Sequence, residues 1–388
     1  MSQLDESLTR RARGPTLPRM TITTATKPRL LCGPGPTNVD PAVLEAMQAP
    51  MLGHLDPDFH DILLEVVADL REVYRADDGV VLAIQATGTA GMEAGIANLV
   101  EPGDTVIVGS AGYFGERICE IARRYGANVV EVTAAWGECV PREQLLDALE
   151  RHPQARLVAV VHAETSTGVE QPLAELGHAL KGSDTLLMAD CVTSLGGVTL
   201  DVGGWGIDYA YSCTQKCLAA PPGLSPVAVS ERALERIAAR KSPVPFSLDL
   251  ELLRRYWIER PAAYHHTAPI LQIYALREAL RQVLDEGLQA RIESHDYAGR
   301  YLQRQLRARG LELLADPAHQ LAPLTAIRVP DGVDGREVQL RLLREHGIEV
   351  GGGLGPAAPP MWRIGLMGAN ANVETADAVL AAFDSVLT

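Results

Sequence analysis

Between about residue 80 and residue 240, short apolar segments alternate with amphipathic helical patterns, and this alternation limits the possible folds more than any other feature of the chain. Helical patterns such as Glu116–Tyr125 and Arg142–Arg151 separate several of the apolar segments. Strands that alternate with helices predict an α/β fold, in which helices cover both faces of a mostly parallel sheet. In such sheets ligands gather at the carboxyl ends of the strands. Seven segments are predicted to be strands: Val80–Ile84, Thr105–Val108, Val129–Val132, Leu157–Val161, Leu186–Ala189, Asp208–Tyr211 and Val227–Val229.

The segments outside this region predict a second, smaller domain. Helical patterns run from about Leu248 to Arg309. The last part of the chain contains two predicted strands and two predicted helices: Leu324–Val329, Trp362–Leu366, Val338–Glu345 and Val373–Leu387. A chain of 388 residues is long enough for one large domain and a small one. We therefore predict an N-terminal arm, a large domain and a small α+β domain, over residues 1–28, 29–285 and 286–388 respectively.

The net charge and the hydropathy of the chain make nucleic acids and membranes poor first candidates as partners. The formal net charge of −14 comes from 49 acidic against 35 basic residues, which disfavours nucleic acid and anionic membranes. No apolar run reaches the roughly 18 residues that cross a bilayer, and the N-terminal region lacks the apolar centre of a signal peptide. The six cysteines are scattered singly, as in proteins of a reducing compartment. We therefore predict a cytoplasmic protein without a metal site.

One aspartate and one lysine lie where two successive predicted strands end. Asp190 follows the apolar run Thr185–Ala189, and Lys216 lies shortly after the apolar run Ile207–Tyr211. Pyridoxal phosphate (PLP) needs an amine for its aldehyde and an acid for its pyridinium nitrogen, so the pair predicts a PLP site. The alternative is an exposed lysine beside a strand, which is the usual environment of this residue type.

Other residues at predicted strand ends are suited to holding such a cofactor. Thr87, Gly88 and Thr89 form a turn before a helix, where free backbone N–H groups attract anions such as a phosphate. Phe114 could stack on a flat ring, and the hydroxyl of Thr165 could reach a ring oxygen. Each has a simpler alternative, which is a helix cap for the two turns and a core-filling ring for the aromatic residue.

Two more groups lie towards the C-terminus. In Tyr264-His265-His266-Thr267, the hydroxyls of Tyr264 and Thr267 suit a phosphate, whereas the adjacent histidines do not have the spacing of a helical metal motif. Arg363 lies in an otherwise apolar strand, where a buried guanidinium needs a carboxylate partner. Both a structural ion pair within the protein and a substrate carboxylate are open as that partner.

Nine short motifs follow one another along the chain: Gly33–Asn38, Glu101–Asp104, Glu164–Val169, Ser194–Gly197, Gln215–Lys216, Ala220–Gly223, Tyr264–Thr267, Gly352–Pro356 and Arg363–Gly368. In this order and spacing they resemble the alanine–glyoxylate / serine–pyruvate aminotransferase group of the class V PLP-dependent aminotransferases. The resemblance extends from about Leu31 to the C-terminus. It implies a fold-type I PLP-dependent transferase, with a mostly parallel seven-stranded sheet in the large domain and a small C-terminal α+β domain.

The resemblance also implies a role for each candidate residue. Lys216 would bind the cofactor aldehyde as an imine and then shuttle a proton, and Asp190 would keep the pyridinium nitrogen protonated. Phe114 would stack on the ring, Thr165 would contact its 3-oxygen, and Arg363 would bind the substrate carboxylate. The protein would form a homodimer with composite sites, in which the N-terminal arm wraps the partner subunit. The cofactor phosphate would be held by Thr87, Gly88, Thr89 and Gln215 of one chain and by Tyr264 and Thr267 of the other.

The activities that the resemblance implies differ in their substrates. We predict ping-pong transamination from alanine or serine to glyoxylate or pyruvate. Ureidoglycine–glyoxylate and serine–glyoxylate aminotransferases are alternatives, because they share most of these motifs and Trp136–Glu138 and His54–Pro57 are similar to the former. Phe114 and Thr89 stand where alanine–glyoxylate enzymes commonly have Trp and His, which weakens the inference of substrate preference. Pyridoxamine–pyruvate aminotransferase and a PLP-dependent lyase are more remote. A lyase of the cysteine desulfurase type would need a nucleophilic cysteine on a C-terminal loop, yet no cysteine follows Cys217.

Overall fold

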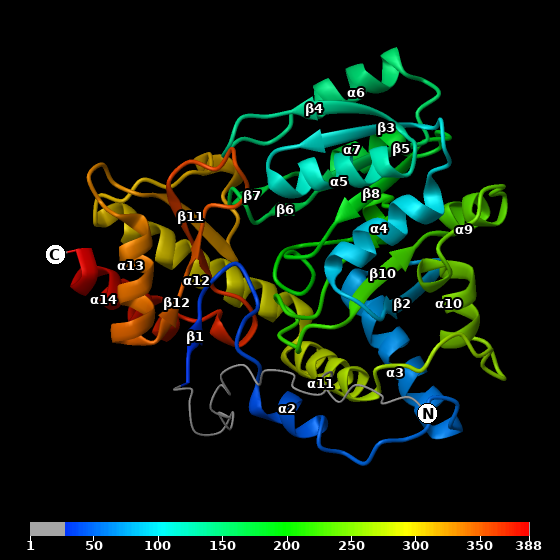
Figure 1. Ribbon diagram of the computed structural model, residues 1–388, viewed down its shortest axis with the longest axis horizontal. Coiled ribbons are helices and arrows are strands. Elements are labelled where there is room, and N and C mark those ends of the chain that lie inside the picture. The colour runs from blue at the N-terminus through cyan, green and yellow to red at the C-terminus, as the bar shows by residue number, and fades with distance from the viewer. Residues whose placement is uncertain (1–27, 388) are drawn as a thin grey trace, which may run out of the picture.

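The computed structural model describes residues 28–387, and a seven-stranded sheet lies at the centre of its larger part (Figure 1). In spatial order the strands are β2 (Val80–Ile84), β10 (Ser225–Val229), β9 (Tyr209–Tyr211), β8 (Leu186–Asp190), β5 (Leu157–Val161), β3 (Thr105–Ser110) and β4 (Asn128–Thr133). Strand β10 runs antiparallel to both β2 and β9, and the other neighbouring strands of this sheet pair in parallel. The predicted α/β class is confirmed, and each of the seven predicted strands is present with its ends shifted by at most two residues.

Six of these strands are buried along their whole length, because helices cover both faces of the sheet; only the edge strand β4 is partly exposed. The continuous apolar sequences of the strands follow from this burial. The helices around the sheet are α3 (Pro57–Tyr74), α4 (Gly88–Leu99), α5 (Tyr113–Arg124), α6 (Arg142–Arg151), α7 (Ala174–Leu180), α8 (Val202–Trp205), α9 (Glu231–Ala238), α10 (Leu250–Trp257) and α11 (Ile270–Glu286). A small hairpin, β6 (Ala163–Glu164) with β7 (Val169–Glu170), follows β5.

A second apolar core is built by the C-terminal residues, around Trp362 and Phe383. Its elements are α12 (Leu288–Ala308), β11 (Leu324–Arg328), α13 (Gly335–Arg341), β12 (Ile348–Glu349), β13 (Gly351–Gly352), β14 (Met361–Gly365) and α14 (Val373–Leu387). The helix predicted over Val338–Glu345 is instead α13 followed by a π-helical turn over Leu342–His346. The predicted division near residue 285 separates most residues of the two cores, but Leu30 and Cys32 pack in the second core and Leu288 packs against the first. The predicted domain bounds stay a prediction.

The first described residues join this second core rather than the first. Strand β1 (Leu30–Leu31) pairs in parallel with β12, and the backbone N–H of Gly365 donates to the carbonyl oxygen of Cys32 at 2.8 Å. Helix α2 (Pro41–Ala46) follows, capped by the side chain of Asp40. The predicted N-terminal arm lies outside the described residues, apart from residue 28.

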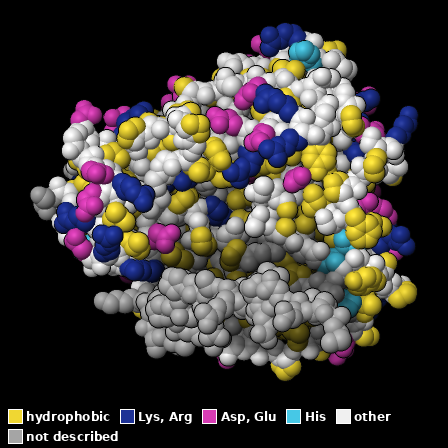
Figure 2. All heavy atoms as spheres, viewed as in Figure 1, with side chains coloured by type: hydrophobic (Ala, Val, Ile, Leu, Met, Phe, Trp, Pro, Cys, Tyr) yellow, Lys and Arg dark blue, Asp and Glu magenta, His cyan; other side chains and the backbone are white. Residues whose placement is uncertain are grey.

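The surface carries both signs of charge. Acidic and basic side chains are interspersed on the face seen in Figure 2, as expected for a chain with an acidic excess but many arginines. No helix between residues 28 and 387 is both long and apolar enough to cross a membrane.

Candidate active site

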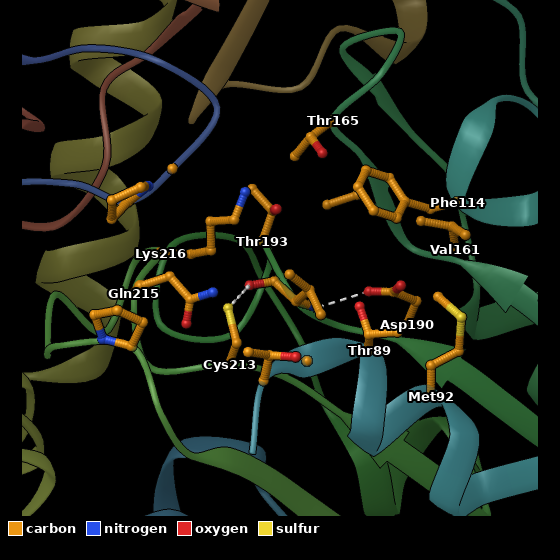
Figure 3. A pocket seen from close by; sticks show the side chains of 17 residues that line it. Thr89, Met92, Phe114, Val161, Thr165, Asp190, Thr193, Cys213, Gln215 and Lys216 are labelled. Atoms are coloured by element: carbon orange, nitrogen blue, oxygen red, sulfur yellow. Dashed lines mark hydrogen bonds between the residues drawn. The ribbon is translucent and has the colours of Figure 1, made fainter. Parts of the chain in front are cut away.

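A cavity of about 240 Å³ lies at the carboxyl ends of the sheet strands (Figure 3). Eight predicted site residues line it together: Thr87, Gly88, Thr89, Phe114, Thr165, Asp190, Gln215 and Lys216. They come from segments that are up to 129 positions apart, from Thr87 to Lys216, so only the parallel sheet brings them together. The cavity lies where ligands bind in folds of this class.

Lys216 is buried within the protein, with 9% of its surface exposed. Its Nζ donates a hydrogen bond to the carbonyl oxygen of Pro34. Gly35 allows this approach, because its φ is +110° and a Cβ atom there would lie 2.6 Å from Cδ of the lysine. Burial lowers the pKa of Lys216. A larger fraction of neutral amine is therefore present, which is the form that attacks an aldehyde. The alternative of an exposed strand-end lysine is wrong.

Asp190 is the last residue of β8, and both of its carboxylate oxygens accept hydrogen bonds. The hydroxyl of Tyr211 donates to one oxygen at 2.7 Å, and the backbone N–H of Val192 donates to the other at 2.9 Å. Burial raises the pKa of Asp190 to about 6, although these two hydrogen bonds act in the opposite direction. A carboxylate in this position can pair with a protonated ring nitrogen inside the cavity.

The N-terminus of α4 opens into the same cavity. Thr87 has the backbone of an N-cap residue, but its side chain makes no capping hydrogen bond and is available to a ligand. Within residues 28–387, the buried Oε1 of Gln215 and Oγ1 of Thr193 also lack a hydrogen-bond partner. Free N–H groups at a helix N-terminus and an unpaired hydroxyl such as that of Thr193 can donate to an anion, whereas Gln215 would donate to it through its Nε2 and not through the unpaired oxygen. The residues therefore fit a phosphorylated cofactor such as PLP.

Phe114 is held in place through its backbone by Glu164. One carboxylate oxygen of Glu164 accepts from the N–H of Phe114 at 3.1 Å, and the other accepts from the N–H and hydroxyl of Ser166. The carboxylate caps α5, whose N-cap residue is Gly112 and has no side chain to do so. The guanidinium of Arg117 lies 5.2 Å from the centre of the Phe114 ring. Glu164 thus holds the backbone of Phe114, and Arg117 packs against its ring.

Arg363 is buried in β14 next to the cavity but does not itself line it. Its Nε donates to the carbonyl oxygen of Gly352 at 2.7 Å, and its Nη1 donates to that of Thr165 at 3.1 Å. No carboxylate of residues 28–387 lies within 4.0 Å of the guanidinium, so the structural ion pair is not found there. Burial lowers the pKa of Arg363 to about 10, which leaves it cationic at neutral pH. Glu164 is the carboxylate that acts on Arg363 electrostatically, in the direction that raises its pKa. Binding of a substrate carboxylate by Arg363 stays a prediction.

Tyr264 and Thr267 do not contribute to this cavity. Both are exposed, Tyr264 by 63%, and the Tyr264 ring lies 5.5 Å from that of His54. The Nδ1 atoms of the neighbouring His265 and His266 are 2.7 Å apart, so these two rings contact each other. Within residues 28–387 no group of three or more His, Cys, Asp or Glu is arranged to hold a metal. The predicted phosphate contacts of Tyr264 and Thr267 stay a prediction.

Several cavity residues were given no role from the sequence. Gly35 and Thr193 illustrate the two signals that were available: the glycine lies in an unusual Gly-Pro-Gly-Pro segment, and the threonine follows a strand-end aspartate by three positions. Pro36 and Pro222 lie in two of the nine motifs, although no role followed from that. The other unpredicted residues are apolar and carry no signal that separates them from core residues: Met92, Val161, Ala163, Val192 and Cys213.

The raised pKa of Asp190 makes a prediction about stability. Because the pKa in the folded protein lies above its ordinary value of 3.8, the stabilisation associated with the bound proton is present at low pH. It is lost as the pH rises through about 6. In the cofactor-free protein, the unfolding free energy of Asp190→Asn relative to wild type should therefore rise by about 2 kcal/mol between about pH 4 and pH 7. Urea unfolding at a series of pH values measures this gain.

The matched control is Asp184→Asn, at an exposed aspartate in the loop before the same strand. Its unfolding free energy relative to wild type should stay nearly constant over the same pH range. A pH-independent difference for Asp190→Asn would contradict the assignment of a destabilised carboxylate to this position.

The comparisons with known proteins agree with this geometry. The profile of the Aminotransferase class-V family matches residues 29–373. The chain is 38% identical to the (S)-ureidoglycine–glyoxylate transaminase of Bacillus subtilis, over 92% of this chain and 90% of that protein. It is 37% identical to the alanine–glyoxylate aminotransferase of Drosophila melanogaster, over 92% of each. The crystal structure of alanine–glyoxylate aminotransferase from Nostoc sp. superposes with a TM-score of 0.91 and 47% identity, covering 95% of this chain and 98% of that one.

These similarities confirm two predictions made from the sequence. The architecture is that of the fold-type I aminotransferases, with its mostly parallel seven-stranded sheet. The resemblance to the alanine–glyoxylate group is confirmed by relatives that match over most of the chain. The chain belongs to the class-V aminotransferases.

Proposed function

We propose that this protein uses PLP to move an amino group from alanine or serine to glyoxylate or pyruvate in a ping-pong reaction. The observation that carries the proposal is that Lys216 and Asp190 line one cavity with the N-terminus of α4. The named activities of the relatives, which include transfer between alanine and glyoxylate, support the substrate class.

The cavity residues would hold the cofactor by its three functional ends. Thr87, Thr89 and Gln215 would bind the phosphate at the N-terminus of α4, Asp190 would pair with the ring nitrogen, and Lys216 would bind the aldehyde. When bound, PLP supplies a ring that withdraws electrons from the substrate Cα. The side chain of Phe114 would cover one face of that ring and keep water from it.

Lys216 and Arg363 would then divide the work on the amino acid. The partly neutral amine of Lys216 can take the proton from Cα and return it elsewhere, because burial has lowered its pKa. The guanidinium of Arg363 can bind the α-carboxylate through charge-assisted hydrogen bonds. Binding of this carboxylate would fix the orientation of Cα towards Lys216.

A ureidoglycine donor is the second candidate. The specific observation that favours it is the 38% identity to the Bacillus subtilis transaminase, whose name gives that substrate. The sequence also left open a lyase of the cysteine desulfurase type. A solved cysteine desulfurase is only 14% identical to this chain, so that similarity supports the fold and not the activity.

Absorption spectroscopy with a panel of amino donors tests the proposal. We expect the protein loaded with PLP to show a visible band that L-alanine or L-serine removes and glyoxylate restores. Ureidoglycine, pyridoxamine and L-cysteine complete the panel. Failure to bind PLP would contradict the cofactor. A bound cofactor that responds faster to ureidoglycine than to alanine would move the assignment to the second candidate.

We further propose a homodimer in which Tyr264 and Thr267 reach the cofactor phosphate of the partner subunit. Among the described residues, Tyr264 is exposed, and so is Phe246, which stacks on His265 with ring centroids 4.8 Å apart; the other exposed large apolar side chains are Leu44, Met51, Leu55 and Tyr297. Hydrophobic side chains gather beside histidines near the right edge of the face in Figure 2. Exposed apolar groups of this kind are typical of subunit interfaces. We also propose a cytoplasmic location, which the six unpaired cysteines support.

A further inference from the structure

Tyr211 lies next to Asp190 in the sheet and is fully buried. The two residues are register partners in the parallel pair β8–β9, and the hydroxyl of Tyr211 donates to Oδ2 of the aspartate at 2.7 Å. Burial raises the pKa of Tyr211 well above its ordinary value. The phenol therefore keeps its proton and acts as a hydrogen-bond donor over the whole working pH range.

The surroundings of Asp190 otherwise do little to favour its charged form. Among the groups that face it, Glu164 opposes ionisation by its like charge, whereas Lys216 favours it only weakly. The remaining titratable neighbours are the uncharged side chains of Cys191, Cys213 and Tyr74. Burial has the largest effect on the pKa of Asp190 and raises it. The hydrogen bond from Tyr211 has the next largest effect and lowers this pKa, followed by the bond from the N–H of Val192.

We propose that Tyr211 is a positioning residue, which keeps Asp190 ionised and orients it towards the pyridine nitrogen of the cofactor. An ionised carboxylate has about four lone-pair sites, so the bonds from Tyr211 and Val192 leave room for a ring N–H. Without the phenol, the carboxyl group becomes a stronger base and the proton shared with the ring moves onto Asp190. The role of Tyr211 presupposes the proposed cofactor.

Tyr209 provides a matched control on the same strand. It lies two residues before Tyr211, on the same face of β9, and is equally buried. Its hydroxyl donates to the carbonyl oxygen of Gly91 at 2.8 Å and not to the aspartate. Replacing either tyrosine with phenylalanine removes one buried hydroxyl and one hydrogen bond, but only Tyr211→Phe changes the surroundings of Asp190.

The test is ¹⁵N NMR of the ring nitrogen in protein loaded with ¹⁵N-labelled PLP. In Tyr211→Phe we expect the signal at neutral pH to move towards that of an unprotonated pyridine. The affinity for PLP, measured by fluorescence titration of the cofactor-free protein, should fall on the order of 10-fold. Tyr209→Phe should leave the signal and the affinity close to wild type. In an Asp190→Asn background, Tyr211→Phe should have no further effect on the signal.

An unchanged ring-nitrogen signal in Tyr211→Phe, or an equal shift in both phenylalanine variants, would overturn the proposal. A protein that binds no PLP at all would instead overturn the proposed cofactor, so the two failures are distinguishable. If Tyr211→Phe does not fold, wild-type protein containing 3-fluorotyrosine provides the measurement. Its more acidic phenol donates more strongly to Asp190 and should move the signal in the opposite direction; no movement would again contradict the proposal.

Discussion

Lys216→Ala is expected to lower transamination by at least about 10⁴-fold and to remove the visible band of the lysine-bound cofactor, because both the nucleophile and the proton carrier are lost. The protein should stay folded, since the change deletes a buried amine and leaves the surrounding cavity wall in place. Steady-state kinetics, the absorption spectrum and the unfolding temperature of the cofactor-free protein measure the three parts of this prediction.

Two controls make the result specific. Lys181→Ala changes an exposed lysine in the same domain and should behave as wild type. Ethylamine added to Lys216→Ala should restore part of the activity, because a small amine can enter the space that the side chain leaves. Turnover of Lys216→Ala at the wild-type rate without added amine would contradict the role of the lysine.

Arg363→Gln is expected to lower kcat/KM for the amino donor by about 100-fold, equivalent to about 3 kcal/mol, mainly through a higher KM. The glutamine side chain cannot provide the positive charge for the substrate carboxylate. Arg363→Lys keeps the charge but loses the planar pair of donors, and should lie between glutamine and wild type. The spectrum of the bound cofactor should be unchanged in both variants, because Arg363 does not line the cavity.

Arg328→Gln is the matched control for Arg363. Arg328 lies on the neighbouring strand β11, where it forms an exposed ion pair with Glu312 at 2.9 Å. Such pairs contribute little, so this variant should keep its KM within about twofold of wild type. An Arg363→Gln protein with an unchanged KM for both substrates would exclude the guanidinium as the carboxylate-binding group.

Much of the fold could be predicted from the sequence because its strands are short, apolar and bounded by polar turns. Because the strands could be recognised in this way, Lys216 and Asp190 could be predicted to lie at strand ends, where a shared cavity is expected. The ends of helices were predicted less well where the helical geometry changes, as in the π-helical turn that follows α13. A one-residue widening of a helical turn leaves no clear trace in the hydrophobic pattern.

The contacts across neighbouring strands could not be predicted. The hydrogen bond from Tyr211 to Asp190 depends on the register of β8 with β9, and periodicity alone does not define which strands pair or in which register. Similarly, Gly35 reaches the cavity from a segment that precedes the first sheet strand by about 45 residues. Proximity of this kind is a property of the tertiary structure and not of local sequence.

The pairing of β1 with β12 has a consequence for the order in which the protein can assemble. Residues 30–37 bond to residues more than 300 positions later, through Cys32 with Gly365 and Thr37 with Met367. The same segment carries Pro34 and Gly35, which contact Lys216. During synthesis these bonds can form only after residues 365 and 367 have left the ribosome. The contacts of this segment with Lys216 are therefore supported by the second core only from that point on, which would delay cofactor capture until β14 has been made.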